Sequence, residues 1–217
     1  MKTLKASSSR LVTVLAIIGI VGPILFWALL LLAQSLHPGY DAWKESISRL
    51  EFGPFGWLQT MNFYLITIFI VAFGVAVYLG IAKSRISRIA SLLLVVMGFA
   101  QLLSAVFQVD VDPSGPKSIA YITHNMAFII SMALFPLAVL LLVPNLWSDV
   151  RWRPFAFLTI VAGTVVLMLE LVWLVSQPID SHLIDPWFGI YERILFSIPL
   201  AWMIIISTRL LHIGHRL

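Results

Sequence analysis

The chain has no cysteine, and only 11% of its 217 residues are charged. Without cysteine it can form no disulfide, no thiolate nucleophile, no iron–sulfur cluster and no cysteine-based zinc site. Soluble domains contain about a quarter of charged residues and about half of apolar ones, whereas hydrophobic residues make up 60% of this chain. The composition therefore indicates an integral membrane protein.

Several cofactor signatures are also missing. The sequence contains no phosphate-binding loop and no glycine-rich dinucleotide motif. Only one histidine, His124, lies inside a long apolar segment, which disfavours haem, and the basic connections are too short for an ATP-driven domain. The cofactors of the chain, if it has any, stay unknown at this point.

Six apolar stretches have the length of about 20 residues that a helix needs to cross a hydrocarbon core of about 30 Å. They cover residues 11–33, 63–82, 89–109, 119–143, 155–176 and 187–208. Barrel strands would be about ten residues long with a period of two. The sequence predicts an all-α polytopic membrane protein, one domain over residues 1–217, with six transmembrane helices. The first stretch exceeds a signal-peptide core of about 7–15 residues, so we expect a retained anchor.

Lys and Arg are distributed unevenly between the connections. Ten of the fourteen share one side if the six helices alternate in direction, while nine of the ten acidic residues fall on the other side. Because cytoplasmic loops carry the excess of Lys and Arg, we expect both termini to be cytoplasmic, in a plasma membrane. The net charge of +4 then reflects topology and contact with anionic lipid, and no nucleic-acid partner is expected.

The first outer connection, residues 34–62, is long enough to hold structure of its own. Asp41 is suited to cap a short helix in which Trp43, Ile47 and Leu50 recur at i, i+4 and i+7. We expect this amphipathic helix to lie at the membrane interface. Gly53 then marks a break before the second transmembrane helix.

Short motifs along nearly the whole chain resemble a known family. They are His37-Pro-Gly-Tyr-Asp41, Ser46-Ile-Ser48-Arg-Leu50 with Gly53-Pro54, Asn62-Phe63, Phe107-Gln-Val-Asp110, His124 and Gly189-Ile-Tyr191-Glu192-Arg193. Together they resemble the six-helix membrane family catalogued as domain of unknown function 998, with Glu51 where a glycine is expected. A more distant likeness is to the DRAM, Sfk and Frag group, associated with lipid handling, autophagy and GPI-anchor maturation. The closer resemblance implies a fold and a membrane location, without an established activity.

Three ionisable residues, His124, Glu170 and Arg193, lie inside the predicted spans at similar depths from the outer side. Such a group costs about 2.5–3.5 kcal/mol or more at the bilayer centre, so it normally faces a partner within the protein. We expect Glu170 and Arg193 to meet, and all three to converge with Asn125 on a pocket open to the outer leaflet. The alternatives are an ion pair that only fixes helix packing and a His124 ring bonded to a neighbouring carbonyl or carboxylate.

Candidate catalytic groups are His124, Glu170 and Ser46. Ser46 or Ser48 would act as nucleophile, His124 as base, and Asp110 or Glu170 as the carboxylate that orients the base. The alternative for both serines is capping of local structure, and the chain has no Gly-x-Ser-x-Gly motif. Candidate ligand-binding residues share a position near the outer ends of the helices: Arg193, Glu192, Asn125, Asp110 and Tyr191.

A metal site is left open. Asp110-Val-Asp112 and Asp180-Ser-His182-Leu-Ile-Asp185 offer oxygen and nitrogen ligands, although solvated loops explain both runs as well. The predicted function is the binding or processing of a lipid or other amphiphile in a membrane-lipid environment. The alternatives are a carrier of a small solute or of protons, and a scaffold without catalysis. A carrier would need a polar path to the inner face, where ionisable residues are almost absent.

Overall fold

The computed structural model describes residues 2–112, 116–176 and 184–214. Within these ranges the long helices are α1 (Lys2–Ser35), α2 (Gly56–Gly80), α3 (Arg85–Val106), α4 (Ile119–Ser148), α5 (Arg153–Ser176) and α6 (Phe188–Gly214). Two short 3-10 helices, η1 (Ile47–Glu51) and η2 (Asp185–Trp187), complete the described secondary structure. Six helices are long and apolar enough to cross a membrane. The prediction of an all-α integral membrane protein is confirmed.

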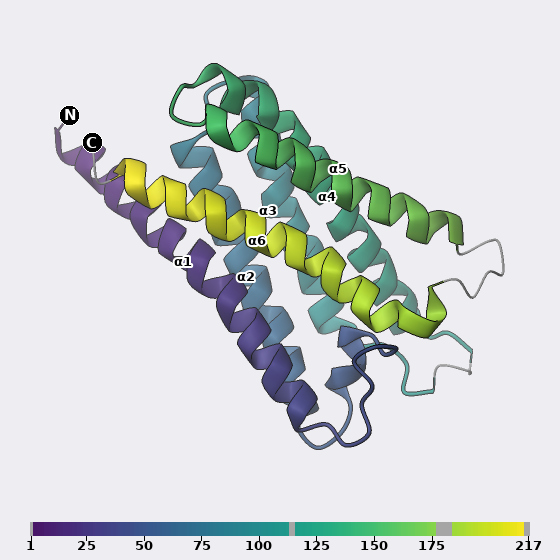
Figure 1. Ribbon diagram of the computed structural model, residues 1–217. Coiled ribbons are helices and arrows are strands. Elements are labelled where there is room, and N and C mark those ends of the chain that lie inside the picture. Colours follow the sequence, from purple (N-terminus) through teal and green to yellow (C-terminus); the bar gives the residue numbers. More distant parts are fainter. Residues whose placement is uncertain (1, 113–115, 177–183, 215–217) are drawn as a thin grey trace.

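The helices form a bundle in which neighbours in the sequence pack side by side, except that α6 packs mainly on α1 and much less on α5. Figure 1 shows both termini at one end of this bundle. We call that end the terminal end. The opposite end, where α1 leads into η1, is called the loop end.

Local sequence explains where α3 and α4 begin and how α3 packs closely on α2. Ser84 Oγ accepts a hydrogen bond from the Ser87 amide (3.1 Å), and Ser87 Oγ accepts one from the Ser84 amide (3.0 Å), which is a capping box at the start of α3. Ser118 caps α4 by accepting from the Tyr121 amide (3.0 Å). Gly98 lets α3 approach α2, since a Cβ there would lie 2.6 Å from a methyl group of α2.

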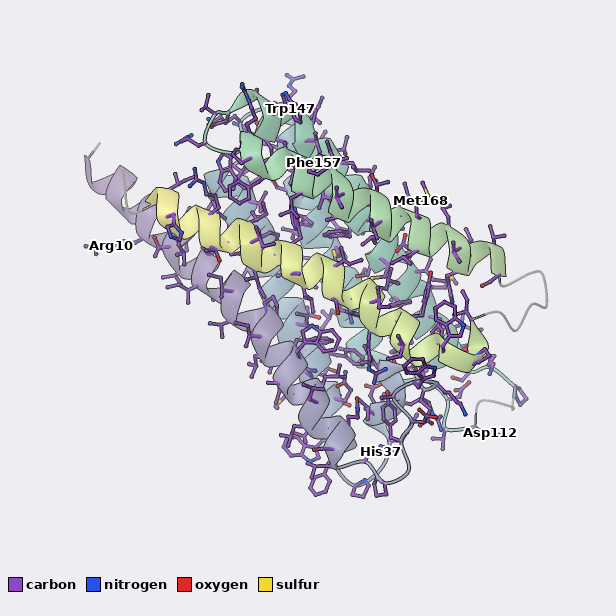
Figure 2. The ribbon with its side chains drawn as sticks, viewed as in Figure 1. Arg10, His37, Asp112, Trp147, Phe157 and Met168 are labelled. Carbon is purple, nitrogen blue, oxygen red and sulfur yellow. The ribbon has the colours of Figure 1, made fainter. Side chains whose placement is uncertain are left out.

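Aromatic residues are the largest side chains of the buried core, and apolar residues also cover the outside. Trp202 packs between the rings of Phe73 and Phe135, with centroid distances of 5.4 and 5.6 Å, and its Nε1 donates to Thr159 Oγ1 (3.0 Å). Phe157 and Met168 on α5 point away from the bundle in Figure 2 and are 69% and 55% exposed. An apolar outer face of this extent fits contact with lipid chains.

Several helix bounds differ from the predicted ones, and one of these differences is that α2 begins at Gly56 rather than at residue 63. The added turns contain polar residues that hydropathy excludes, but they are buried in the protein. Gln59 is fully buried, and Asn62 Nδ2 donates to the Phe26 carbonyl oxygen of α1 (3.0 Å). A polar helix start is stable here because α1 supplies the partner that lipid lacks.

The predicted amphipathic helix starting at Asp41 does not form over the predicted residues. Residues 41–45 form turns, and the helical segment is the 3-10 helix η1. Ile47 and Leu50 are buried in the protein core, whereas Trp43 is 59% exposed. The three residues therefore do not share one apolar face, because the chain bends before the helix begins.

Candidate functional site

The connection between α1 and α2 folds over the loop end and is attached to the first turns of α6. The Ile47 amide donates to Glu192 Oε2 (2.6 Å). Gly189 allows the close approach, since a Cβ there would lie 2.5 Å from the carbonyl oxygens of Ala42 and Glu45. These contacts hold η1 against the bundle.

Arg193 on α6 binds the same connection through several hydrogen bonds. Its Nη2 donates to Tyr40 OH (2.8 Å) and to Gln34 Oε1 (3.3 Å). Its Nη1 donates to the carbonyl oxygens of Gly189 (2.8 Å) and Glu45 (3.3 Å). Burial raises the pKa of Tyr40 to about 12, so the hydroxyl keeps its proton at neutral pH. Arg193 therefore anchors the loop.

The predicted ion pair between Glu170 and Arg193 does not form. None of the hydrogen bonds of Arg193 reaches α5, and Glu170 Oε1 is buried without a hydrogen-bond partner among the described residues. The Tyr191 hydroxyl donates to the Leu169 carbonyl oxygen. The prediction failed because α6 packs mainly on α1 rather than on α5. Arg193 on α6 therefore does not meet Glu170 on α5, although the two helices follow each other in the sequence.

His124 on α4 connects η1 with the end of α3. Its Nδ1 lies 2.7 Å from the carbonyl oxygen of Phe107, and its Nε2 lies 2.8 Å from Ser48 Oγ. A carbonyl oxygen only accepts, so Nδ1 carries a proton and donates it. In the neutral ring Nε2 therefore accepts a hydrogen bond from the Ser48 hydroxyl. His124 and Ser48 are 4% and 5% exposed.

A cavity of about 290 Å³ lies beside this pair at the loop end. Its wall is formed by η1 and its flanks, the segment after α3, helices α4 and α5, the residue before η2, and α6: Ser46, Ser48, Arg49, Val109, Asp110, Tyr121, His124, Asn125, Phe128, Trp173, Ile184, Phe188 and Glu192. Hydroxyl, amide, imidazole and charged groups thus meet aromatic rings in one wall. The volume of about 290 Å³ is just below the roughly 300–1,000 Å³ of ligand pockets, which suits a polar headgroup or a small ligand.

Charges of both signs contribute to this wall. Arg49 Nη1 donates to the carbonyl oxygens of Val111 (2.9 Å) and Asp110 (3.2 Å). The Asp110 carboxylate accepts from the Ser118 amide (3.0 Å), and hydrogen bonds from Ser118 hold its pKa below the ordinary value. At neutral pH the cavity therefore has a guanidinium and an ionised carboxylate in its wall.

The candidates from the sequence divide into two groups. Those in the cavity wall are Ser46, Ser48, Asp110, His124, Asn125 and Glu192. Those outside it are Glu170, Tyr191 and Arg193. The catalytic and ligand-binding roles of all nine stay predictions.

Sequence reasoning gave no role to Arg49, Tyr121 and Trp173, which also line the cavity. Arg49 directly follows Ser48 in the Ser-x-Ser-Arg run, and that adjacency was the available signal. Trp173 was hidden among the apolar residues of its helix.

A second, shallower hollow of about 500 Å³ lies on the side of α2 and α3, lined in part by Phe52, Thr60 and Gln108. Thr60 Oγ1 donates to Oε1 of Glu51 (3.2 Å), a residue that is only 7% exposed. Burial raises the pKa of Glu51 to about 7, against the opposing effect of the Thr60 hydrogen bond. Glu51 is therefore a buried titratable group beside this hollow on the side of α2 and α3.

Metal ligands do not cluster within the described part of the chain. No group of three or more His, Cys, Asp or Glu that could hold a metal ion is found among these residues. Asp180 and His182 lie outside the described residues, as does the side chain of Asp185. The metal hypothesis for that segment is therefore not addressed by the structure.

A family model matches residues 20–209, and its description is "Protein of unknown function (DUF998)". Curated proteins give no match, and solved structures give none either. The likeness to the DRAM, Sfk and Frag group stays a prediction. The match covers most of the chain and all six apolar helices, at least in part. The chain therefore belongs to the family of unknown function DUF998.

Proposed function

We propose that this protein binds a lipid or another amphiphile, with the polar part of the ligand in the loop-end cavity and the apolar part along the neighbouring helices. The observation that carries the proposal is the composition of the cavity wall. It joins Arg49, His124 and Asn125 with the rings of Phe128 and Trp173.

A mixed wall of this kind favours a ligand with two unlike parts. The guanidinium and the amide suit a phosphate, carboxylate or ester group, whereas aromatic rings suit alkyl chains or the apolar edge of a headgroup. The exposed apolar faces of the helices continue beyond the cavity; examples are Met126 on α4 (49% exposed) and Val172 on α5 (49% exposed). A ligand chain leaving the cavity would therefore enter a lipid-like surface.

In the proposed orientation the terminal end is cytoplasmic and the cavity opens to the outer leaflet of the plasma membrane. Support comes from basic residues in the connections at the terminal end and in the first turns of the helices that follow them, which share a side with both termini: Lys83, Arg85, Arg88, Arg151 and Arg153. Cytoplasmic loops carry this excess.

Photo-crosslinking in lipid nanodiscs tests the proposal. The probes are a phospholipid and a lysophospholipid, each with a diazirine next to the glycerol ester, and the crosslinked peptides are identified by mass spectrometry. Ser46→Phe adds a ring to the cavity wall, and Leu137→Phe is the matched control on the exposed face of α4, where Leu137 is 51% exposed. We expect crosslinks on cavity-lining peptides that Ser46→Phe removes and Leu137→Phe keeps.

Other outcomes contradict the proposal. Crosslinks spread evenly over the outer helix faces, unchanged by Ser46→Phe, would identify ordinary boundary lipid. Flux of protons or a small solute into proteoliposomes, lost in His124→Ala, would identify a carrier instead. Absence of both signals in folded protein would leave the scaffold role.

A further inference from the structure

The hydrogen-bond network around His124 has the arrangement of an activated hydroxyl nucleophile. A catalytic serine needs a base within hydrogen-bond reach and a third group that orients the base. Ser48 Oγ lies 2.8 Å from Nε2, and the Phe107 carbonyl oxygen lies 2.7 Å from Nδ1. The carbonyl sets the ring so that the nitrogen with the free lone pair faces the serine.

Ser48 is held in place through its two neighbours in the sequence, Ile47 and Arg49. The amide of Ile47 donates to the Glu192 carboxylate (2.6 Å). The side chain of Arg49 donates to two carbonyl oxygens after α3, at 2.9 and 3.2 Å. Since both neighbours are fixed to other elements, the hydroxyl needs little reorganisation to meet the base or a ligand.

We propose that Ser48 is a nucleophile that accepts an acyl group, with His124 as its general base, and that the ligand is an amphiphile with a carboxylic ester. This inference rests on the proposed function. It adds a reaction class and a substrate class to what would otherwise be a binding site. The carboxylate of the Ser-His-Asp arrangement is replaced here by a backbone carbonyl.

The reaction would follow the two steps of acyl transfer. Ser48 Oγ forms a bond to the ester carbonyl carbon while its proton passes to His124 Nε2, and that proton then goes to the departing alkoxide, which leaves as an alcohol. In the second step, water gives a proton to Nε2 and attacks the acyl-serine, which releases the carboxylic acid and restores the Ser48 hydroxyl. Arg49, in the wall of the same cavity, suits the negative charge that develops on the carbonyl oxygen.

A fluorophosphonate with an alkyl chain is the direct probe, because it modifies serines that a neighbouring base activates. The full-length protein is labelled in nanodiscs, and the modified peptide is identified by mass spectrometry. We expect modification of Ser48 that is absent in Ser48→Ala and slowed about 100-fold or more in His124→Gln, in line with the usual contribution of a general base. Ser104→Ala is the matched control, since this buried hydroxyl donates to the backbone carbonyl of His124 (3.2 Å) rather than to its ring.

A second variant keeps the test valid if Ser48→Ala or His124→Gln fails to fold. Because the chain has no cysteine, Ser48→Cys introduces a single thiol, and alkylation by iodoacetamide reports whether position 48 is open to a reagent. We expect alkylation at neutral pH, with an apparent pKa of the thiol below the roughly 8.5 of a free cysteine, because the neighbouring imidazole pairs with the thiolate.

The outcomes separate the two proposals. Labelling of Ser48 that depends on His124, followed by release of acid from a p-nitrophenyl ester of an alkyl acid, supports the nucleophile. Absence of labelling at Ser48 in protein whose Ser48→Cys form is alkylated refutes it, and so does an unreactive thiol or labelling of another serine. If cavity crosslinks to the diazirine lipids persist in these cases, the binding function stands and only the acyl-transfer step fails.

Discussion

The buried carboxyl group of Glu51 gives a sharp prediction about stability and pH. Its Oε1 accepts a hydrogen bond from Thr60 (3.2 Å), and its Oε2 is buried without a hydrogen-bond partner among the described residues. Burial raises the pKa of Glu51 from 4.5 to about 7. Glu51→Gln keeps the size and the polarity of the side chain and removes its titration.

The sign of the effect follows from proton binding. Between pH 4.5 and about 7 the folded state holds the Glu51 proton while the unfolded chain releases it, so the wild type loses stability as the pH rises through this window. One pKa unit corresponds to about 1.4 kcal/mol, which makes the full loss roughly 3 kcal/mol. In Glu51→Gln this loss is absent, so the variant gains on the wild type as the pH rises.

Thermal unfolding followed by tryptophan fluorescence in nanodiscs measures this difference between pH 4 and 8.5. A change of 1 kcal/mol moves Tm by about 2–4 °C in a domain of this size, so Glu51→Gln should exceed the wild type by several degrees at pH 8 and match it near pH 4.5. Thr60→Val removes the opposing hydrogen bond and should extend the window to higher pH. A Tm difference that is constant with pH, or a wild type that gains on the variant at alkaline pH, would refute the reasoning.

Three further substitutions test how the loop and the terminal end are held. Arg193→Met should lower the free energy of unfolding by about 2–4 kcal/mol, as expected for lost hydrogen bonds to a charged group. The cost should be smaller in a Tyr40→Phe background, because Arg193 and Tyr40 share a hydrogen bond (2.8 Å). Equal costs in both backgrounds would contradict this. Asp149→Asn should cost under about 1 kcal/mol at neutral pH, since its Lys and Arg partners are 62% and 45% exposed. These partners hold the pKa of Asp149 well below its usual range, so the cost should vanish as acid protonates the wild type; a cost that persists in acid would contradict the pairing. Gly189→Ala should lower Tm and expose the α1–α2 connection to limited proteolysis, because the added Cβ would collide with that connection. Ile194→Ala is the control, at a 45% exposed position on the same helix. Equal proteolysis of the two variants would count against the close packing of Gly189.

The six helices could be predicted because a segment that crosses a membrane needs about 20 mostly apolar residues. Hydropathy misses a helix start where protein takes the place of lipid, as in α2. Gln59 and Asn62 are polar yet buried, and only the position of α1 shows that Asn62 has a hydrogen-bond partner. The turns before η1 were also missed. The helical spacing of Trp43, Ile47 and Leu50 predicts one continuous helix and gives no sign of a bend in the chain between them.

The site was predictable in its composition and less so in its pairings. Placing His124 and Asn125 in one layer required only their distance from the helix end, and both line the cavity. Pairing Glu170 with Arg193 required knowing which helix α6 packs against, and that contact is made with α1. The sequence offered both Ser46 and Ser48 as partners of His124, and only the structure selects Ser48, because the two residues are far apart in the chain.

A structure determined in nanodiscs with added phospholipid and lysophospholipid tests the central claim most directly. We predict density for a polar headgroup in the cavity of about 290 Å³, with its ester group within hydrogen-bond distance of Ser48 and its chain between the outer faces of the helices. Lipid confined to the outer surface of the bundle, with only water or protein side chains in the cavity, would contradict the account.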